Sequence, residues 1–130
     1  MIYKAQTAML DSVLADMESK MEEYGLPAKD TISFLVAIEE IFVNVANYAY
    51  PGTEGEVDVN LVIEAGKACV TFTDSGIAFD PIAKVDPDIN ASVEDRPIGG
   101  LGIYIVKKSM DGIEYERKDG KNILSFWKNF

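Results

Sequence analysis

Helical and strand patterns occupy separate stretches of this chain, and this separation constrains the fold more than any other feature. Apolar residues recur at helical spacing over Met9–Tyr24 and again over Thr31–Tyr48. Apolar and polar residues then alternate in EVDVNLVIE and in KACVTFTD, which the turn EAGK joins into a hairpin. A chain of this kind is expected to pack a layer of helices on one sheet.

The last part of the chain repeats both patterns. A third helix is expected over Gly102–Met110, and IEYERK and KNILSFWK form a second hairpin around the turn Asp119-Gly120. We therefore predict one α+β domain over residues 1–130. It is expected to be a two-layer α/β sandwich with a mixed, mostly antiparallel sheet and its helices on one face. At 130 residues the chain can bury a core without disulfides or metals.

Composition excludes several classes of function. Twelve Lys and Arg against 22 Asp and Glu give a formal net charge of −10, which repels nucleic acids and anionic lipids, so neither is expected as a partner. The chain has no histidine, which excludes Ser-His-Asp triads, Cys-His pairs and histidine-bearing zinc sites. A single cysteine, no leader pattern and no apolar run near the length of about 20 residues that spans a membrane favour a cytoplasmic protein.

A polar stripe interrupts the second helix. Glu40, Asn44 and Asn47 are spaced at i, i+4 and i+7, so they project in one direction from a helix that is apolar on much of its surface. Polar side chains walled by apolar ones are costly to bury unless they find partners. The stripe is either a solvated face or a pair of buried caps, or it is the floor of a polar pocket.

Two further segments allow a structural and a functional interpretation. Asp74 ends the strand VTFTD and precedes Ser75-Gly76, which suits an Asx turn as well as a ligand site. The segment RPIGGLGIYIVKK places three glycines before a helix, either for a turn or as a phosphate seat at a helix N-terminus. The stretch from Gly76 to Pro97 is too long for an ordinary connection, and such loops are usually lids or binding loops.

Three blocks in fixed order carry a resemblance to a known family. EEIFVNVANYAY on a helix, DSGIAFDP after a strand and RPIGGLGIYIVKK opening a helix resemble the N, G1 and G2 boxes of the GHKL, or Bergerat-type, ATP-binding fold. The spacing is most similar to that of the small stand-alone anti-sigma-factor serine kinases and related partner-switching regulators. The resemblance extends from Ala5 to Lys128.

The resemblance implies a role for each matching residue. Glu40 would be the general base, Asn44 the ligand of a Mg²⁺ ion that bridges the phosphates, and Asp74 the acceptor for the adenine amino group. Gly76 would lie beside the adenine ring, and Ile77–Ile98 would form the nucleotide lid. Other residues expected to bind the nucleotide are Asn47, Ala78, Arg96, Gly99, Gly100, Leu101, Gly102 and Ile103, with Gly100 and Gly102 forming the backbone seat for the phosphates.

The function that the resemblance implies is an ATP-dependent protein serine/threonine kinase of the anti-sigma type. It would use ATP and Mg²⁺, phosphorylate a serine or threonine of an antagonist protein, and sequester a sigma factor or similar regulator. The resemblance also allows for a homodimer. The alternative is an ATP-binding switch module that binds partner proteins without phosphotransfer. Tyr48 replaces a residue that is commonly histidine, and Ala78 replaces the second G1 glycine. Arg96 is either a surface residue, or it senses the γ-phosphate or contacts the partner protein and so couples the nucleotide state to lid closure.

Overall fold

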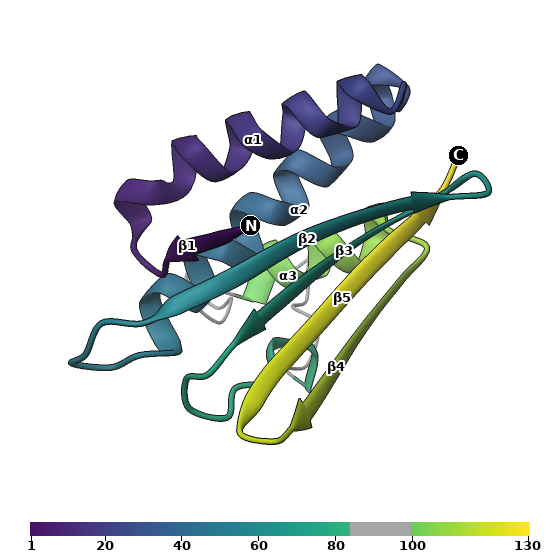
Figure 1. The fold of residues 1–130 in the computed structure, drawn as a ribbon. Helices are drawn as coiled ribbons and strands as arrows, with labels where there is room; N and C mark the ends of the chain where they lie inside the picture. The colour runs from purple at the N-terminus through teal and green to yellow at the C-terminus, as the bar shows by residue number, and fades with distance from the viewer. Residues whose placement is uncertain (84–99) are drawn as a thin grey trace.

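The computed structural model describes residues 1–83 and 100–130, which form a five-stranded sheet with helices on one face (Figure 1). The strands lie in the order β1-β2-β3-β5-β4, and every pairing among them is antiparallel. Their bounds are β1 Ile2–Lys4, β2 Glu56–Glu64, β3 Lys67–Asp74, β4 Gly112–Lys118 and β5 Lys121–Asn129. The helices are α1 Leu10–Glu23, α2 Ala28–Tyr48 and α3 Gly100–Ser109, with short 3-10 turns η1 Thr7–Met9 and η2 Pro81–Ala83.

The predicted two-layer α+β architecture is confirmed, with four differences in detail. The sheet has no parallel pair among the described residues, and it gains the strand β1, which the sequence analysis did not predict. The second helix begins at Ala28, directly after Pro27, whose extended ψ of 142° ends the preceding turn. The third helix begins at Gly100, so the last glycines of the G2 segment lie inside its first turn.

The core lies between the helices and the sheet, and α2 is its central element. Phe34, Ile38 and Phe42 of α2 are fully buried. The ring of Phe34 stacks on that of Phe126 of β5, with ring centres 6.1 Å apart. α1 packs on α2 through one buried row, Val13, Met17 and Met21, and α3 adds Ile103 and Val106.

The length and mean hydropathy of α2, 1.2 over its most apolar window, would also suit a membrane-spanning helix. It is the only helix with these properties in the described part of the chain. Length and composition alone are weak support for a span, since the core helix of a folded domain has the same properties. The packing of α2 against the sheet and α1 identifies it as a core helix.

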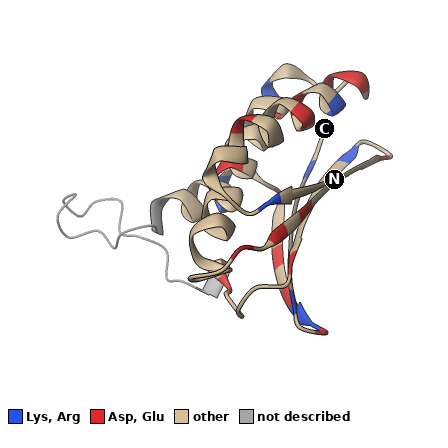
Figure 2. Cartoon of the chain, turned by 60° about the vertical axis from the view of Figure 1, so that its left-hand side comes forward, with Lys and Arg blue, Asp and Glu red and all other residues tan. Residues whose placement is uncertain are grey.

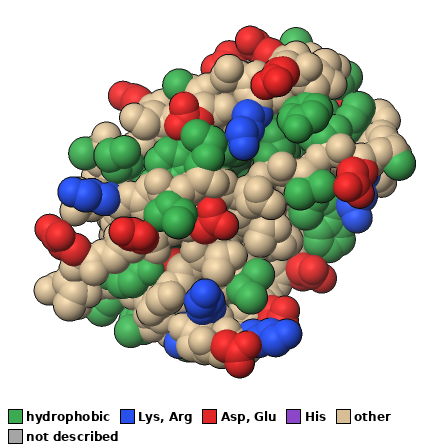
Figure 3. Space-filling model, viewed as in Figure 1, with side chains coloured by type: hydrophobic (Ala, Val, Ile, Leu, Met, Phe, Trp, Pro, Cys, Tyr) green, Lys and Arg blue, Asp and Glu red, His purple; other side chains and the backbone are tan. Residues whose placement is uncertain are grey.

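No helix among the described residues covers the second face of the sheet (Figures 1 and 2). Its cross-strand pairs include Cys69 with Trp127 and Thr71 with Ser125, whose hydroxyl oxygens lie 2.9 Å apart. The Lys67 ammonium lies 5.1 Å from the centre of the Trp127 ring. In the view of Figure 3, acidic and basic side chains are interspersed with hydrophobic ones. This composition is typical of an antiparallel sheet with one solvated face.

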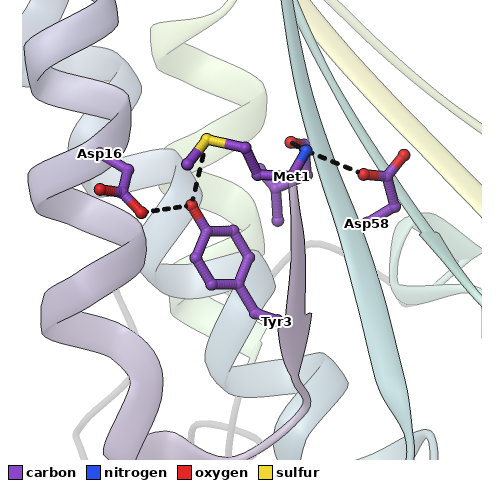
Figure 4. Close-up of polar contacts among 5 residues, drawn as sticks. Met1, Tyr3, Asp16 and Asp58 are labelled. Carbon is purple, nitrogen blue, oxygen red and sulfur yellow. Dashed lines mark hydrogen bonds and ion pairs between the residues drawn. The ribbon is translucent and has the colours of Figure 1, made fainter.

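The short strand β1 is anchored at both of its sides (Figure 4). Toward the sheet, the amino group of Met1 donates to Asp58 Oδ1 and to the carbonyl oxygen of Val59, both at 3.1 Å. Toward the helices, the buried Tyr3 donates its hydroxyl to Asp16 Oδ2 of α1 at 2.8 Å. Burial, and secondarily the Asp16 carboxylate, raise the pKa of Tyr3 well above its usual value near 10.

Candidate functional site

Two residues of the polar stripe on α2 form a hydrogen-bonded pair. Glu40 and Asn44 lie one turn apart on the same face of the helix, and Asn44 Nδ2 donates to Glu40 Oε1 at 3.4 Å. Both side chains are half-buried. Because the amide nitrogen of Asn44 is bonded to the carboxylate, its Oδ1 is the atom left to accept a donor or to ligate a cation.

Asp74 ends β3 in a buried position, with 6% of its surface exposed. Its Oδ1 accepts hydrogen bonds at 2.9 Å from the backbone N–H of Gly76 and from Asn122 Nδ2. The first of these is the bond of an Asx turn, so the structural interpretation of Asp74 is correct. Both bonds go to Oδ1, and Oδ2 remains for another donor, so the turn does not exclude the functional interpretation.

The turn after β3 is fixed against the end of α2 by backbone contacts. Ile77 N–H donates to the carbonyl oxygen of Ala49 at 2.8 Å. Gly76 lies so close that a Cβ there would overlap the Ala49 backbone. A side chain at position 76 would therefore push this turn, and Asp74 with it, away from α2.

A narrow pocket connects Asp74 to Asn44. Its walls are mostly apolar, and its polar members are Asp74, Asn122 and Asn44; the full lining is Ile41, Asn44, Val45, Ala49, Phe72, Asp74, Phe79, Pro81, Tyr115, Asn122 and Leu124. Apolar walls with one buried carboxylate suit an aromatic ring that carries an amino group. The free space of about 20 Å³ is roughly that of one water molecule. A ring can enter only if part of the wall moves, and Phe79 and Pro81 belong to the segment that follows Asp74.

Sequence reasoning missed the residue at the centre of this region, Asn122 of β5, which is 5% exposed. Its Nδ2 donates to Asp74 Oδ1 and, at 2.7 Å, to the carbonyl oxygen of Ile77. Its Oδ1 accepts from the hydroxyl of Tyr115 at 2.5 Å and from Arg117 Nη1 at 3.2 Å. Both amide hydrogens are therefore used within the protein, so Asn122 holds Asp74 in place.

A detectable signal for Asn122 was present in the sequence. It alternates with Leu124 and Phe126 on the buried face of the strand KNILSFWK, and an asparagine in a core-facing register must find partners. Arg117 extends the same network, because its Nη1 also donates to the carbonyl oxygen of Gly76 at 2.8 Å. Three elements, β3, β4 and β5, thus fix the turn from Gly76 to Phe79.

On the other side of Asn44, Glu40 faces the first turn of α3. A Cβ added to Gly102 would overlap the carboxyl group of Glu40, so the α3 backbone lies directly against that carboxylate. A groove here is lined by Val36, Glu39, Glu40, Val43, Gly102 and Ile105. A helix N-terminus favours anions because its first N–H groups are free of helical partners. The site therefore combines a carboxylate, an amide oxygen and a helix N-terminus.

The remaining predicted site residues lie outside this arrangement or are not described. Asn47 and Ala78 are exposed, and the side chain of Ile103 is buried in the core, which leaves only its backbone for a ligand. Tyr48 contacts Phe79, with ring centres 5.4 Å apart. Arg96, Gly99, the side chain of Leu101 and the greater part of the expected lid lie outside the described residues.

No group of three or more His, Cys, Asp or Glu side chains within residues 1–83 and 100–130 could hold a metal ion. The amide oxygen of Asn44 would be one ligand of a Mg²⁺ ion bound there, and a nucleotide and water could supply others. Mg²⁺ accepts such a shell, because it prefers oxygen ligands and keeps several waters.

A nucleotide has an apolar ring and an anionic phosphate chain, and the pocket beside Asp74 and the start of α3 fit these two parts. The chain belongs to the family of histidine kinase-like ATPase domains, whose family model matches residues 3–128. This membership confirms the ATP-binding family and fold expected from the three sequence blocks, and a family of ATP-using proteins implies ATP as the substrate.

Among individual proteins, the chain is similar to the serine-protein kinase RsbW of several Bacillus species. It is 29% identical to that of Bacillus cereus strain B4264 over 121 residues, which cover 90% of this chain and 74% of the relative. It is 28% identical to those of Bacillus mycoides strain KBAB4 and Bacillus anthracis strain A0248, with the same coverage. These relatives agree with the kinase class expected from the sequence.

Proposed function

We propose that this protein is an ATP-dependent protein serine/threonine kinase of the anti-sigma type. One observation carries this proposal: the Glu40 carboxylate lies against the first turn of α3, where the phosphates of a nucleotide would be bound. A domain that only binds nucleotide has no need of a base at this position. The names of the relatives, each a serine-protein kinase, support the same activity.

In the proposed reaction, Asp74 accepts a hydrogen bond from the adenine amino group, and the backbone at the start of α3 binds phosphate oxygens. Asn44 Oδ1 is available to a Mg²⁺ ion, which when bound would neutralise phosphate charge. The hydroxyl oxygen of the acceptor forms a bond to the γ-phosphorus, and the bond from that phosphorus to the β–γ bridging oxygen breaks. ADP leaves with the electron pair of that bond, and Glu40 takes the hydroxyl proton.

The proposed partners follow from the resemblance to the anti-sigma-factor kinases. The substrate would be an antagonist protein with a phosphorylatable serine or threonine, and a sigma factor or similar regulator would be sequestered. We further propose that the protein acts in the cytoplasm and can form a homodimer. Neither nucleic acid nor membrane is part of the proposed function.

The second candidate is a switch module that binds ATP and partner proteins without phosphotransfer. In both candidates the adenine ring must displace part of the wall that includes Phe79, and in this one that displacement is itself the switch. Phe79 also contacts Tyr48, where the resemblance leads one to expect histidine. Nucleotide binding would then move the segment after β3 and change the affinity for a partner.

Removing the proposed base distinguishes the two candidates. Glu40→Gln keeps the shape of the side chain but cannot take a proton, so phosphotransfer should fall by about 10²–10⁴. Affinity for Mg-ATP should change little. Asn44→Ala should reduce both, because it removes the amide oxygen. The assay uses ATP labelled at the γ-phosphate and the small proteins encoded beside the gene, with phosphoserine or phosphothreonine as the readout.

Glu39→Gln is the matched control, because Glu39 is an exposed neighbour in the same groove. It should leave phosphotransfer unchanged. A normal rate for Glu40→Gln would show that Glu40 is not the base. If the unaltered protein binds Mg-ATP and a partner but transfers no phosphate, the switch module is the correct function.

A further inference from the structure

α2 and α3 approach each other most closely at Glu40 and Gly102. A Cβ built on Gly102 would overlap Cδ and both carboxyl oxygens of Glu40. Gly102 lies within a helix, so its backbone does not need the left-handed conformation that often selects glycine. Glycine is needed here for the space that it leaves.

The carboxylate of Glu40 is confined from two sides. Asn44 Nδ2 donates to it from within α2, and the Gly102 backbone lies against it from α3. The groove formed with Val36, Val43 and Ile105 includes this carboxyl group in its lining. The distance between the carboxylate and the start of α3 is therefore set by the missing side chain at position 102.

We propose that Gly102 is a positioning residue for Glu40. By lacking a side chain, it lets the first turn of α3 lie against the carboxylate, and so fixes the spacing between the proposed base and the anion seat at the helix N-terminus. The inference rests on the proposed function only in naming Glu40 the base. The close approach itself holds for either candidate function.

Whether Gly102→Ala raises or lowers the stability of the protein distinguishes this inference from a simple effect of helix propensity. Gly→Ala inside a helix normally stabilises a protein, because alanine has the higher helix propensity. If the carboxylate fills the space, Gly102→Ala should instead destabilise the protein and weaken Mg-ADP binding, since the two helices must separate or the carboxylate must turn away. Thermal unfolding and calorimetric titration with Mg-ADP measure both effects.

A double-mutant cycle tests the contact directly. Gly102→Ala should weaken Mg-ADP binding by about tenfold, and adding Glu40→Ala should restore the affinity to near that of Glu40→Ala alone, because the carboxyl group is gone. Glu39→Ala is the control and should not restore it. Additive effects of Gly102→Ala and Glu40→Ala, or equal rescue by Glu39→Ala, would overturn the inference.

A spectroscopic measurement tests the positioning itself. In protein labelled with ¹³C at the glutamate carboxyls, Glu40→Gln identifies the Glu40 signal. At constant pH, replacing Mg-ADP by the Mg complex of β,γ-imido-ATP adds negative charge near the start of α3, which should change the chemical shift of the Glu40 carboxyl signal. The change in chemical shift should be clearly smaller in Gly102→Ala. Equal changes in both proteins would overturn the inference.

These measurements are independent of phosphotransfer. If the cycle shows coupling but no phosphate is ever transferred, the proposed kinase activity fails and the contact between Gly102 and Glu40 stands. If phosphotransfer depends on Glu40 but the cycle is additive, the kinase stands and the positioning role fails.

Discussion

The structure shows the turn-forming role of Asp74 and leaves its second carboxylate oxygen for the proposed ligand role. Oδ1 closes the turn to Gly76 and receives Asn122, whereas Oδ2 remains for a ligand. The two roles can be separated, because asparagine forms the same turn but lacks the charge. The same logic makes Asn122 a supporting residue, since its amide is saturated within the protein.

Asp74→Asn should therefore leave stability nearly unchanged and weaken ATP binding. The loss of one charged hydrogen bond to the adenine amino group should cost about 1.5–3 kcal/mol of binding free energy. Calorimetric titrations with ATP and GTP test this, together with urea unfolding. If the unaltered protein binds GTP as tightly as ATP, Asp74 does not select adenine over guanine.

Asn122→Ala should cost both stability and nucleotide affinity. It leaves the Tyr115 hydroxyl and Asp74 Oδ1 each short of a partner in a buried place, at about 1–3 kcal/mol of unfolding free energy. Asn129→Ala, at an exposed position on the same strand, is the control and should cost little. Urea unfolding decides, and equal effects of the two substitutions would contradict the network.

At the scale of elements, periodicity predicted the long segments and failed on the short one. The helix over Met9–Tyr24 and both hairpins are confirmed, because each repeats its pattern over several turns or alternations. β1 has only three residues, too few to show an alternation, and it exists because β2 and Asp16 of α1 hold it. Asn122 escaped notice for a related reason: its importance comes from partners on β3 and β4, which sequence spacing alone cannot place.

The anchoring of β1 predicts a pH dependence of stability. The folded protein holds the Tyr3 proton more tightly than the unfolded chain, so this contribution is complete below pH 10 and is lost as the pH rises above 10. Tyr3→Phe should reduce stability by a constant amount at neutral pH and by a decreasing amount above pH 10. Urea unfolding from pH 7 to 11 measures this, with the exposed Tyr24→Phe as the control.

At the scale of the whole molecule, the formal charge of −10 is spread over a domain of 130 residues. The ribbon segments coloured for Asp and Glu in Figure 2 lie both along the helices and on the sheet. Like charges repel more strongly in the compact state than in the unfolded chain.

The architecture of the whole domain could be predicted from the sequence. The nucleotide-binding side of the domain is still partly a prediction, because Arg96, Gly99 and most of the expected lid are not described.

Screening the repulsion among the acidic residues should stabilise the protein. Raising NaCl from about 0.1 M to about 1 M shortens the Debye length from about 10 Å to about 3 Å, so the thermal midpoint should rise. Tetramethylammonium chloride should act similarly, which would exclude a specific sodium site. A falling midpoint in both salts would mean that favourable ion pairs outweigh the repulsion.

The pairing of β3 with β5 has a consequence for the proposed nucleotide site during synthesis of the chain. Asp74 and Asn122 are 48 residues apart in the chain, and both line the same pocket. A ribosome that has completed α1, α2 and the β2–β3 hairpin has made Glu40, Asn44 and Asp74, but the wall that holds Asp74 is still missing. If Asp74 binds the nucleotide as proposed, we expect binding to begin only after β5 has left the ribosome and paired with β3.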